Sequence, residues 1–160
     1  MTLPRDTDAP APGAMLGDDT TAALQNALAA EHAALWMYGL VAAHAPQQAD
    51  TVAAAITSHQ GTRDAAANMI VVGGGTPVGP EPAYVSPQPA TDKASALQLA
   101  IVIEQDCASA WRAVVGFTDD STLRGSALSA LTECSMRMVT WRKAAGIDVV
   151  TDAFPGDPQR

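Results

Sequence analysis

Apolar residues recur at spacings of three and four along most of the chain, the pattern of helices that bury one face. In the first such stretch, Leu24, Leu28, Leu35 and Tyr38 share a face. Four stretches of this kind lie between residues that cap or end helices, and they predict helices over about 18–44, 46–73, 91–117 and 119–146. The pattern therefore predicts an all-α fold built from four long helices.

The connections between the expected helices predict how the helices are arranged. Those after the first and third helices are short, so each flanking pair should form an antiparallel hairpin. The connection over about 73–91, "GGGTPVGPEPAYVSPQPAT", is rich in Pro and Gly. Its roughly 18 residues can extend about 55 Å, further than the roughly 38 Å of a 25-residue helix. We expect a crossover, anchored by Tyr84 and Val85, that makes the second and third helices parallel; the alternative is a flexible linker in an up-and-down bundle.

The two ends of the chain lack the helical pattern. Residues 1–17 are expected to form a flexible tail, and residues 147–160 a C-terminal extension. No basic segment followed by an apolar run marks a secretory signal, and no apolar stretch is long enough to suggest a membrane span. We therefore expect a cytoplasmic protein with no membrane partner, in which Cys107 and Cys134 are reduced thiols.

Composition favours a single domain of closely packed helices. The 160 residues are 48% hydrophobic but only 4% aromatic, which suits Ala-rich helices better than a β-sandwich. A chain of this length favours one domain, which we place at residues 18–146. The formal net charge of -8 argues against nucleic acid and anionic membrane surfaces as partners.

Three polar residues stand in the centre of the apolar faces of the first three helices. They are Glu31, His59 and Glu104, each about a dozen residues into its helix. Helices of similar length packed side by side bring their midpoints to one level, so these side chains should meet inside the bundle. Tyr38, two turns after Glu31, could donate a hydrogen bond to the cluster. Buried carboxylates cost several kcal/mol unless cations or a metal compensate them, so partners are required.

Further charged residues could complete the cluster. Glu133 lies at the same level of the fourth helix, but both it and Arg137 flank the apolar face, so a surface ion pair is an alternative. Arg63 stands one turn after His59. A buried network of three glutamates with His59, Arg63 and Arg137 would nearly balance its own charge. The competing solution is a metal ion with up to four ligands: Glu31, His59, Glu104 and Glu133.

Four stretches carry a resemblance to a known family: "LAAEHAALWMYG", "AITSHQGTRDAA", "ALQLAIVIEQDCASAWRAV" and "LTECSMRMVTWRKAAG". Over about residues 19–146 the chain resembles the ferritin-like superfamily, in particular a small Ala-rich actinobacterial branch described as a ferritin-like domain of unknown function. The resemblance implies a four-helix bundle with a long crossover. It also implies a di-metal centre, with one Glu from each of two helices and Glu-x-x-His from each of the other two.

The chain departs from that ligand pattern at two positions. The matching residues are, in chain order, Glu31, His59, Glu104 and Glu133. Ile56 stands where the first Glu-x-x-His has its glutamate, and Met136 where the second has its histidine. A thioether is a poor ligand for iron, so Met136 does not replace the missing imidazole. The resemblance therefore implies a degenerate ligand set.

Two functions fit these observations. The first is a non-enzymatic bundle in which a Glu/His/Arg network replaces the di-metal centre, no cofactor is bound, and the chain acts by association with itself, as a homodimer, or with another protein. The second is an iron- or manganese-binding oxidoreductase with an incomplete ligand set. We expect the first, because the cationic side chains can nearly neutralise the carboxylates. Metal content after purification distinguishes the two.

Overall fold

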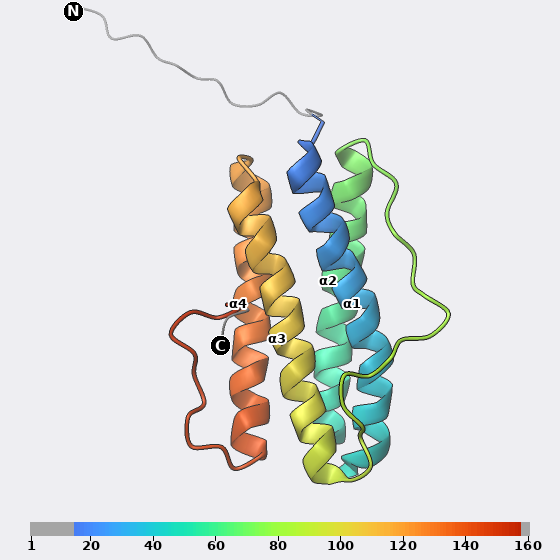
Figure 1. Cartoon of the computed structure of the whole chain (residues 1–160), viewed down its shortest axis with the longest axis vertical. Coiled ribbons are helices and arrows are strands. Elements are labelled where there is room, and N and C mark those ends of the chain that lie inside the picture. Colours follow the sequence, from blue (N-terminus) through green and yellow to red (C-terminus); the bar gives the residue numbers. More distant parts are fainter. Residues whose placement is uncertain (1–14, 158–160) are drawn as a thin grey trace, which may run out of the picture.

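The computed structural model describes residues 15–157, most of which lie in four long helices (Figure 1). The elements are α1 (Asp18–His44), the short 3-10 helix η1 (Pro46–Gln48), α2 (Ala49–Val72), α3 (Lys93–Phe117) and α4 (Ser121–Ala144). No β-strand occurs within 15–157, and no helix there is both long and apolar enough to pass through a bilayer. The all-α prediction is confirmed, while the flexibility predicted for residues 1–14 lies outside the described range.

A long crossover over residues 73–92 makes α2 and α3 parallel, as predicted (Figure 1). It runs along the outer side of α1, where two polar side chains hold its backbone. Gln25 donates from Nε2 to the Thr76 carbonyl at 2.7 Å and accepts from the Val78 amide at 2.8 Å. The Nε2 atom of His32 lies 3.2 Å from the Val78 carbonyl oxygen. The segment is therefore fixed to α1 rather than a free linker.

Aromatic contact adds a second attachment of the crossover to α1. The rings of Trp36 and Tyr84 lie 6.1 Å apart, centre to centre. Tyr84 thus anchors the segment, as predicted. The prediction for Val85 is wrong, because that side chain is 96% exposed.

Aspartates begin the two helices of the second hairpin. The carboxylate of Asp92 accepts from the amide three residues later at 2.8 Å, and Asp120 does the same at 2.6 Å. The start of α1 differs, because Gly17 occupies the N-cap position without a side-chain bond. Asp18 and Asp19 therefore lie in the first turn rather than capping it, where their charges still favour the positive end of the helix dipole.

The four helices do not pack evenly. α3 packs extensively against α1 and α4, and α1 against α2, whereas α2 and α4 touch sparsely. One side of the bundle is therefore open along its length. The resulting hollow, termed the α2–α4 groove, is lined mainly by small or polar side chains, among them Ala54, Ser58, Gly61, Ser129, Thr132 and Thr140.

The C-terminal extension turns back along the bundle after α4 (Figure 1). Arg142 holds it, donating to Asp152 at 2.9 Å and to the Val150 carbonyl at 3.4 Å. Gly156 is buried against α3, and its φ of 75° lies in the left-handed region. A Cβ at this position would lie 2.6 Å from the Ala108 carbonyl oxygen, so both the conformation and the close approach require glycine.

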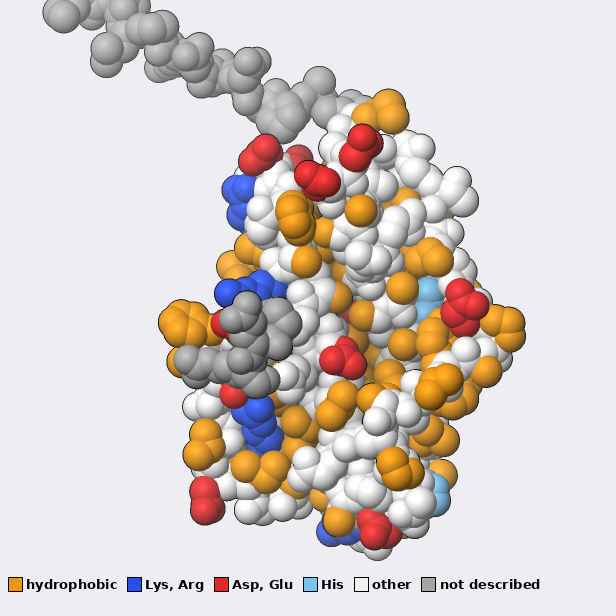
Figure 2. Space-filling view, viewed as in Figure 1, with side chains coloured by type: hydrophobic (Ala, Val, Ile, Leu, Met, Phe, Trp, Pro, Cys, Tyr) orange, Lys and Arg blue, Asp and Glu red, His pale blue; other side chains and the backbone are white. Residues whose placement is uncertain are grey.

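Basic side chains are scattered on the molecular surface. On the face shown in Figure 2, Lys and Arg form separate small groups, most of them on the side of α4 and the C-terminal extension, rather than one continuous patch. This distribution agrees with the net charge of -8. The absence of a nucleic-acid partner stays a prediction that rests on charge.

Candidate functional site

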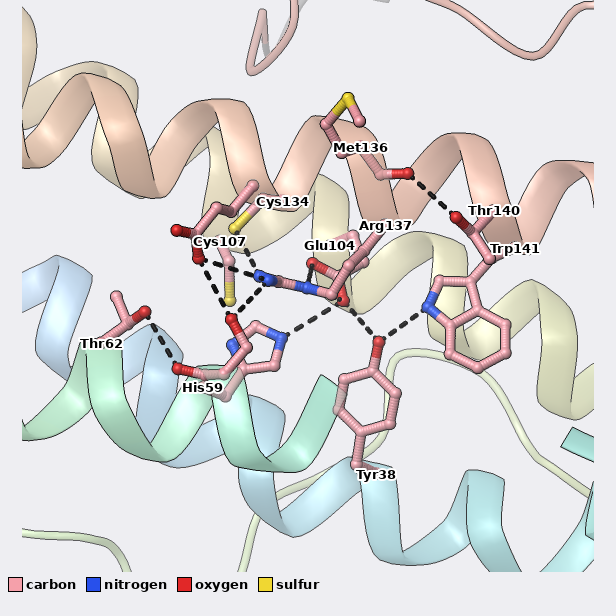
Figure 3. Close-up of polar contacts among 12 residues, drawn as sticks. Tyr38, His59, Thr62, Glu104, Cys107, Cys134, Met136, Arg137, Thr140 and Trp141 are labelled. Carbon is pink, nitrogen blue, oxygen red and sulfur yellow. Dashed lines mark hydrogen bonds and ion pairs between the residues drawn. The ribbon is translucent and has the colours of Figure 1, made fainter. Parts of the chain in front are cut away.

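One side chain from each long helix contributes to a polar cluster inside the bundle. Glu31 from α1, His59 from α2 and Glu104 from α3 are 0% exposed, and the side chain of Arg137 from α4 is 17% exposed. Figure 3 shows His59, Glu104 and Arg137 converging from three helices. These four residues are termed the central network. Glu31, His59 and Glu104 lie near the midpoints of their helices, and Arg137, about one turn past the midpoint of α4, reaches them with its long side chain.

His59 bridges the two buried carboxylates. Its Nδ1 lies 2.6 Å from Oε2 of Glu31, and its Nε2 lies 3.2 Å from Oε1 of Glu104. Burial lowers the pKa of His59, but hydrogen bonds to Glu104 and Glu31 and the charges of these carboxylates outweigh it and raise the pKa to about 9. Both ring nitrogens therefore act as donors, and His59 is an imidazolium near neutral pH.

Glu104 is the most densely bonded member of the central network. Its Oε1 accepts from the Tyr38 hydroxyl and lies 2.9 Å from Nε of Arg137, which is also 3.0 Å from Oε2. Burial opposes ionisation, yet the hydrogen bonds and charges of His59 and Arg137 lower the pKa of Glu104. The pKa of Tyr38 is raised by burial and by the Glu104 charge. Tyr38 therefore donates as a neutral phenol.

Both carboxylate oxygens of Glu31 also accept hydrogen bonds from protein donors. Its Oε1 accepts from the Trp111 indole at 2.7 Å, while Oε2 accepts from His59. Every carboxylate oxygen of Glu31 and Glu104 thus has a donor from the protein. Two carboxylates face one imidazolium and the Arg137 guanidinium, so the formal charges of the central network cancel.

Arg137 joins the central network to the α2–α4 groove. Its Nη1 donates to the Ser58 hydroxyl at 2.7 Å, and its Nη2 to the Cys134 sulfur at 3.3 Å. Glu133 lies at the rim, 3.7 Å from Nη1, with its side chain 56% exposed, and it accepts from Ser58 at 3.1 Å. The prediction that Glu133 is buried is therefore wrong. The alternative of a surface ion pair describes Glu133 only, because Arg137 turns inward and bonds to Glu104.

Arg63 does not belong to the cluster, contrary to the prediction. Its guanidinium pairs with the neighbouring Asp64 at 2.7 Å, and its side chain is 31% exposed. His59 and Arg137 already neutralise the two buried carboxylates, so a third cation inside would have been unpaired. A partly hydrated pair with Asp64 avoids that desolvation cost.

Aromatic donors surround the central network, and the sequence pattern identified only one of them. Tyr38 was predicted to donate into the cluster, and its bond to Glu104 agrees with this. Trp141 was missed; its indole donates to the Tyr38 hydroxyl at 2.8 Å (Figure 3). Trp111 was also missed, although it lies seven residues after Glu104, two turns along the same face of α3. Buried indoles usually need an acceptor, which was the available signal.

The residues that could hold a metal differ from the predicted set. One oxygen of Glu31, one ring nitrogen of His59 and the sulfur of Cys107 lie within 4.8 Å of one another, and all three residues are buried. Among the described residues, Glu104 and Glu133 do not join this group. Met136 is 67% exposed and points away from the cluster, so it supplies no ligand (Figure 3).

Comparison with known proteins supports the fold and gives no activity. The model of a protein family described as "Domain of unknown function (DUF4439)" matches residues 23–159. The crystal structure of a conserved hypothetical protein, rv2844, from Mycobacterium tuberculosis is similar, with 36% identity, a TM-score of 0.79, and coverage of 80% of this chain and 98% of that one. None of the curated proteins compared with the chain matches it. The chain therefore belongs to the DUF4439 family of domains of unknown function.

Proposed function

We propose that the chain is a non-catalytic helical bundle whose central network replaces a metal centre and fixes the arrangement of the four helices. The observation that supports this most strongly is the complete use of both buried carboxylates by protein donors. The formal charges of Glu31, Glu104, His59 and Arg137 cancel without an ion. A ferritin-like ancestry, suggested by the sequence motifs, and a cytoplasmic location are parts of the same proposal.

Metal binding would have to disrupt this network. His59 would lose its Nδ1 proton, which is held with a pKa of about 9. At neutral pH that deprotonation costs about 2.7 kcal/mol. Glu31 would also give up its 2.6 Å hydrogen bond to His59. Arg137 would then place a guanidinium charge near a divalent cation, which is unfavourable.

We predict that the chain, purified without chelators, contains much less than one equivalent of metal and melts at the same temperature with or without added ferrous or manganous ion. A metal that binds only the folded chain at a hundred times its dissociation constant would add about 2.7 kcal/mol. Elemental analysis and calorimetry measure both quantities. Stoichiometric metal that is lost on Glu31→Ala or His59→Ala would overturn the proposal.

A metal-binding oxidoreductase is the second candidate, and the juxtaposition of Glu31, His59 and Cys107 favours it. In this arrangement His59 would bind through one nitrogen while Glu104 accepts from the other, as carboxylates often orient metal-bound histidines. The thiolate makes the donor set softer than the carboxylate-rich set expected for iron or manganese, and closer to that of zinc. Retention of one equivalent of metal in wild-type chain, and its loss in Cys107→Ser, would favour this candidate.

We further propose that the chain acts by self-association through the α2–α4 groove. The open side of the bundle has small side chains, which allow a second helix to approach closely. Met136, 67% exposed, adds an apolar contact at the edge of the groove. No other long side of the bundle leaves two helices so poorly packed against each other within residues 15–157.

We predict a dimer in solution that Met136→Glu converts to a monomer, because a charge in an apolar contact is costly. Val149→Glu is the matched control, since Val149 is 73% exposed but lies outside the groove. Light scattering after size-exclusion chromatography gives the molar mass. A wild-type monomer at every concentration, or a dimer that persists in Met136→Glu, would contradict this interface.

A further inference from the structure

Cys107 and Cys134 face each other across the α3–α4 hairpin. Glu104 of α3 pairs with Arg137 of α4. Cys107 lies three residues after Glu104, and Cys134 lies three residues before Arg137. Because α3 and α4 are antiparallel, the two cysteines therefore lie opposite each other. Both are free thiols, 1% and 0% exposed. Their side chains interact directly; this contact and burial raise the pKa of Cys107. The ion pairs of Glu31 and Glu104 with His59 and Arg137 do not involve either thiol.

The two sulfur atoms have different surroundings. Cys134 Sγ accepts from Arg137 Nη2 at 3.3 Å (Figure 3). Cys107 Sγ instead donates to the Ala30 carbonyl at 3.7 Å. Arg137 also lines the α2–α4 groove, so Cys134 is the sulfur in direct contact with a groove-lining side chain. A thiol that donates to a carbonyl is held in the protonated form. Cys134 is thus suited to attack an oxidant, and Cys107 to react in the second step.

We propose that Cys107 and Cys134 are a peroxide-sensitive thiol pair that closes to a disulfide between α3 and α4. The Cys134 sulfur attacks one oxygen of hydrogen peroxide, the O–O bond breaks, and water leaves as Cys134 becomes a sulfenic acid. The Cys107 sulfur then attacks the Cys134 sulfur; the S–O bond breaks, and a second water leaves with the Cys107 proton. The two thiols lose two electrons and two protons, and the peroxide is reduced to two waters.

Arg137 gives the pair a route to solvent. Its side chain lines the α2–α4 groove, which has a volume of about 580 Å³ in this region, and it lies directly against Cys134. When the groove is not occupied by a second chain, a small peroxide in it lies against the side chain that contacts the Cys134 sulfur. The disulfide would join α3 to α4 beside the Glu104–Arg137 pair, so oxidation would stiffen the hairpin that closes the central network.

Treatment of the folded full-length chain with hydrogen peroxide tests the proposal. We expect both thiols to become resistant to alkylation, the intact mass to fall by two hydrogen atoms, and peptide mapping to find a Cys107–Cys134 link that dithiothreitol removes. Cys107→Ser should stop at a sulfenic acid on Cys134 that dimedone traps. Cys134→Ser should slow oxidation of the remaining thiol about tenfold or more. Circular dichroism checks that each variant is folded, and Cys→Ala replaces any Cys→Ser variant that is not.

Three results would overturn the proposal. The first is survival of both thiols in the folded chain at a peroxide dose that oxidises the urea-unfolded chain. The second is a disulfide formed only between two chains. The third is equal oxidation rates in Cys107→Ser and Cys134→Ser. Treatment in the presence of a chelator keeps any metal off Cys107, so failure of the thiol proposal is distinguishable from failure of the proposed structural role of the central network.

Discussion

Replacing Glu104 with alanine should lower the free energy of unfolding by about 3–5 kcal/mol, the range found when one partner of a buried ion pair is removed. Glu104 accepts hydrogen bonds from Tyr38, His59 and Arg137. Without it, the Tyr38 hydroxyl, Nε2 of His59 and Nε of Arg137 lose their acceptor, and the central network carries excess positive charge. Urea denaturation of the wild-type and variant chains measures the difference.

Glu133→Ala is the matched control, because Glu133 lies at the same level of the bundle with a side chain that is 56% exposed. Its loss should cost about 0.5 kcal/mol or less. A cost of that size for Glu104→Ala would contradict the structural role of the central network. If Glu104→Ala does not fold, Glu104→Gln retains an acceptor oxygen, and its cost must still exceed that of Glu133→Gln.

Stability should fall by roughly 3 kcal/mol as the pH rises through the pKa of His59. That pKa is raised from 6.5 to about 9 in the folded chain, because Glu104 and Glu31 accept from both ring nitrogens. The folded chain therefore binds this proton more tightly than the unfolded chain does. The contribution is complete below pH 6.5 and is lost as the pH rises through about 9. Urea denaturation across this range measures it.

Histidine variants assign the pH dependence to one residue. His59→Gln should lack the loss of stability, whereas His32→Gln should retain it, because the His32 ring lies against a backbone carbonyl rather than a carboxylate. A flat profile in the wild-type chain, or a slope that survives in His59→Gln, would show that His59 is not held as an imidazolium. At acidic pH the opposite sign applies to Glu104, whose lowered pKa makes stability fall as that carboxylate is protonated.

Most of the fold follows from local sequence signals. The apolar spacing and the breaks around Gly73–Gly75 located the helices to within a few residues, and the length and stiffness of the Pro-rich segment favoured a crossover. Contacts between residues far apart in the sequence could not be predicted in the same way. Gln25 and Trp36 hold the crossover through partners about fifty residues away, and Gly156 packs on Ala108. No local pattern encodes such pairings.

The central network was predicted correctly where a polar residue interrupts an apolar face, as at Glu31, His59 and Glu104. In α4 the pattern left two arrangements open, because Glu133 and Arg137 lie one turn apart at the same edge of the buried face. The long Arg137 side chain reaches inward to Glu104, while Glu133 remains at the groove. Which of two flanking residues turns inward depends on the charge already inside the bundle, and the carboxylates from α1 and α3 select the cation.

The protonation state of His59 is the most direct test of a central network neutralised by protein groups alone. Nitrogen NMR of the histidine-labelled chain, purified without chelators, reports both ring nitrogens. We predict that both carry a proton near neutral pH, hydrogen-bonded to Glu31 and Glu104, and that added zinc ion changes neither signal. A His59 ring that is neutral, or that loses its Nδ1 proton when zinc is added, would contradict the metal-free network.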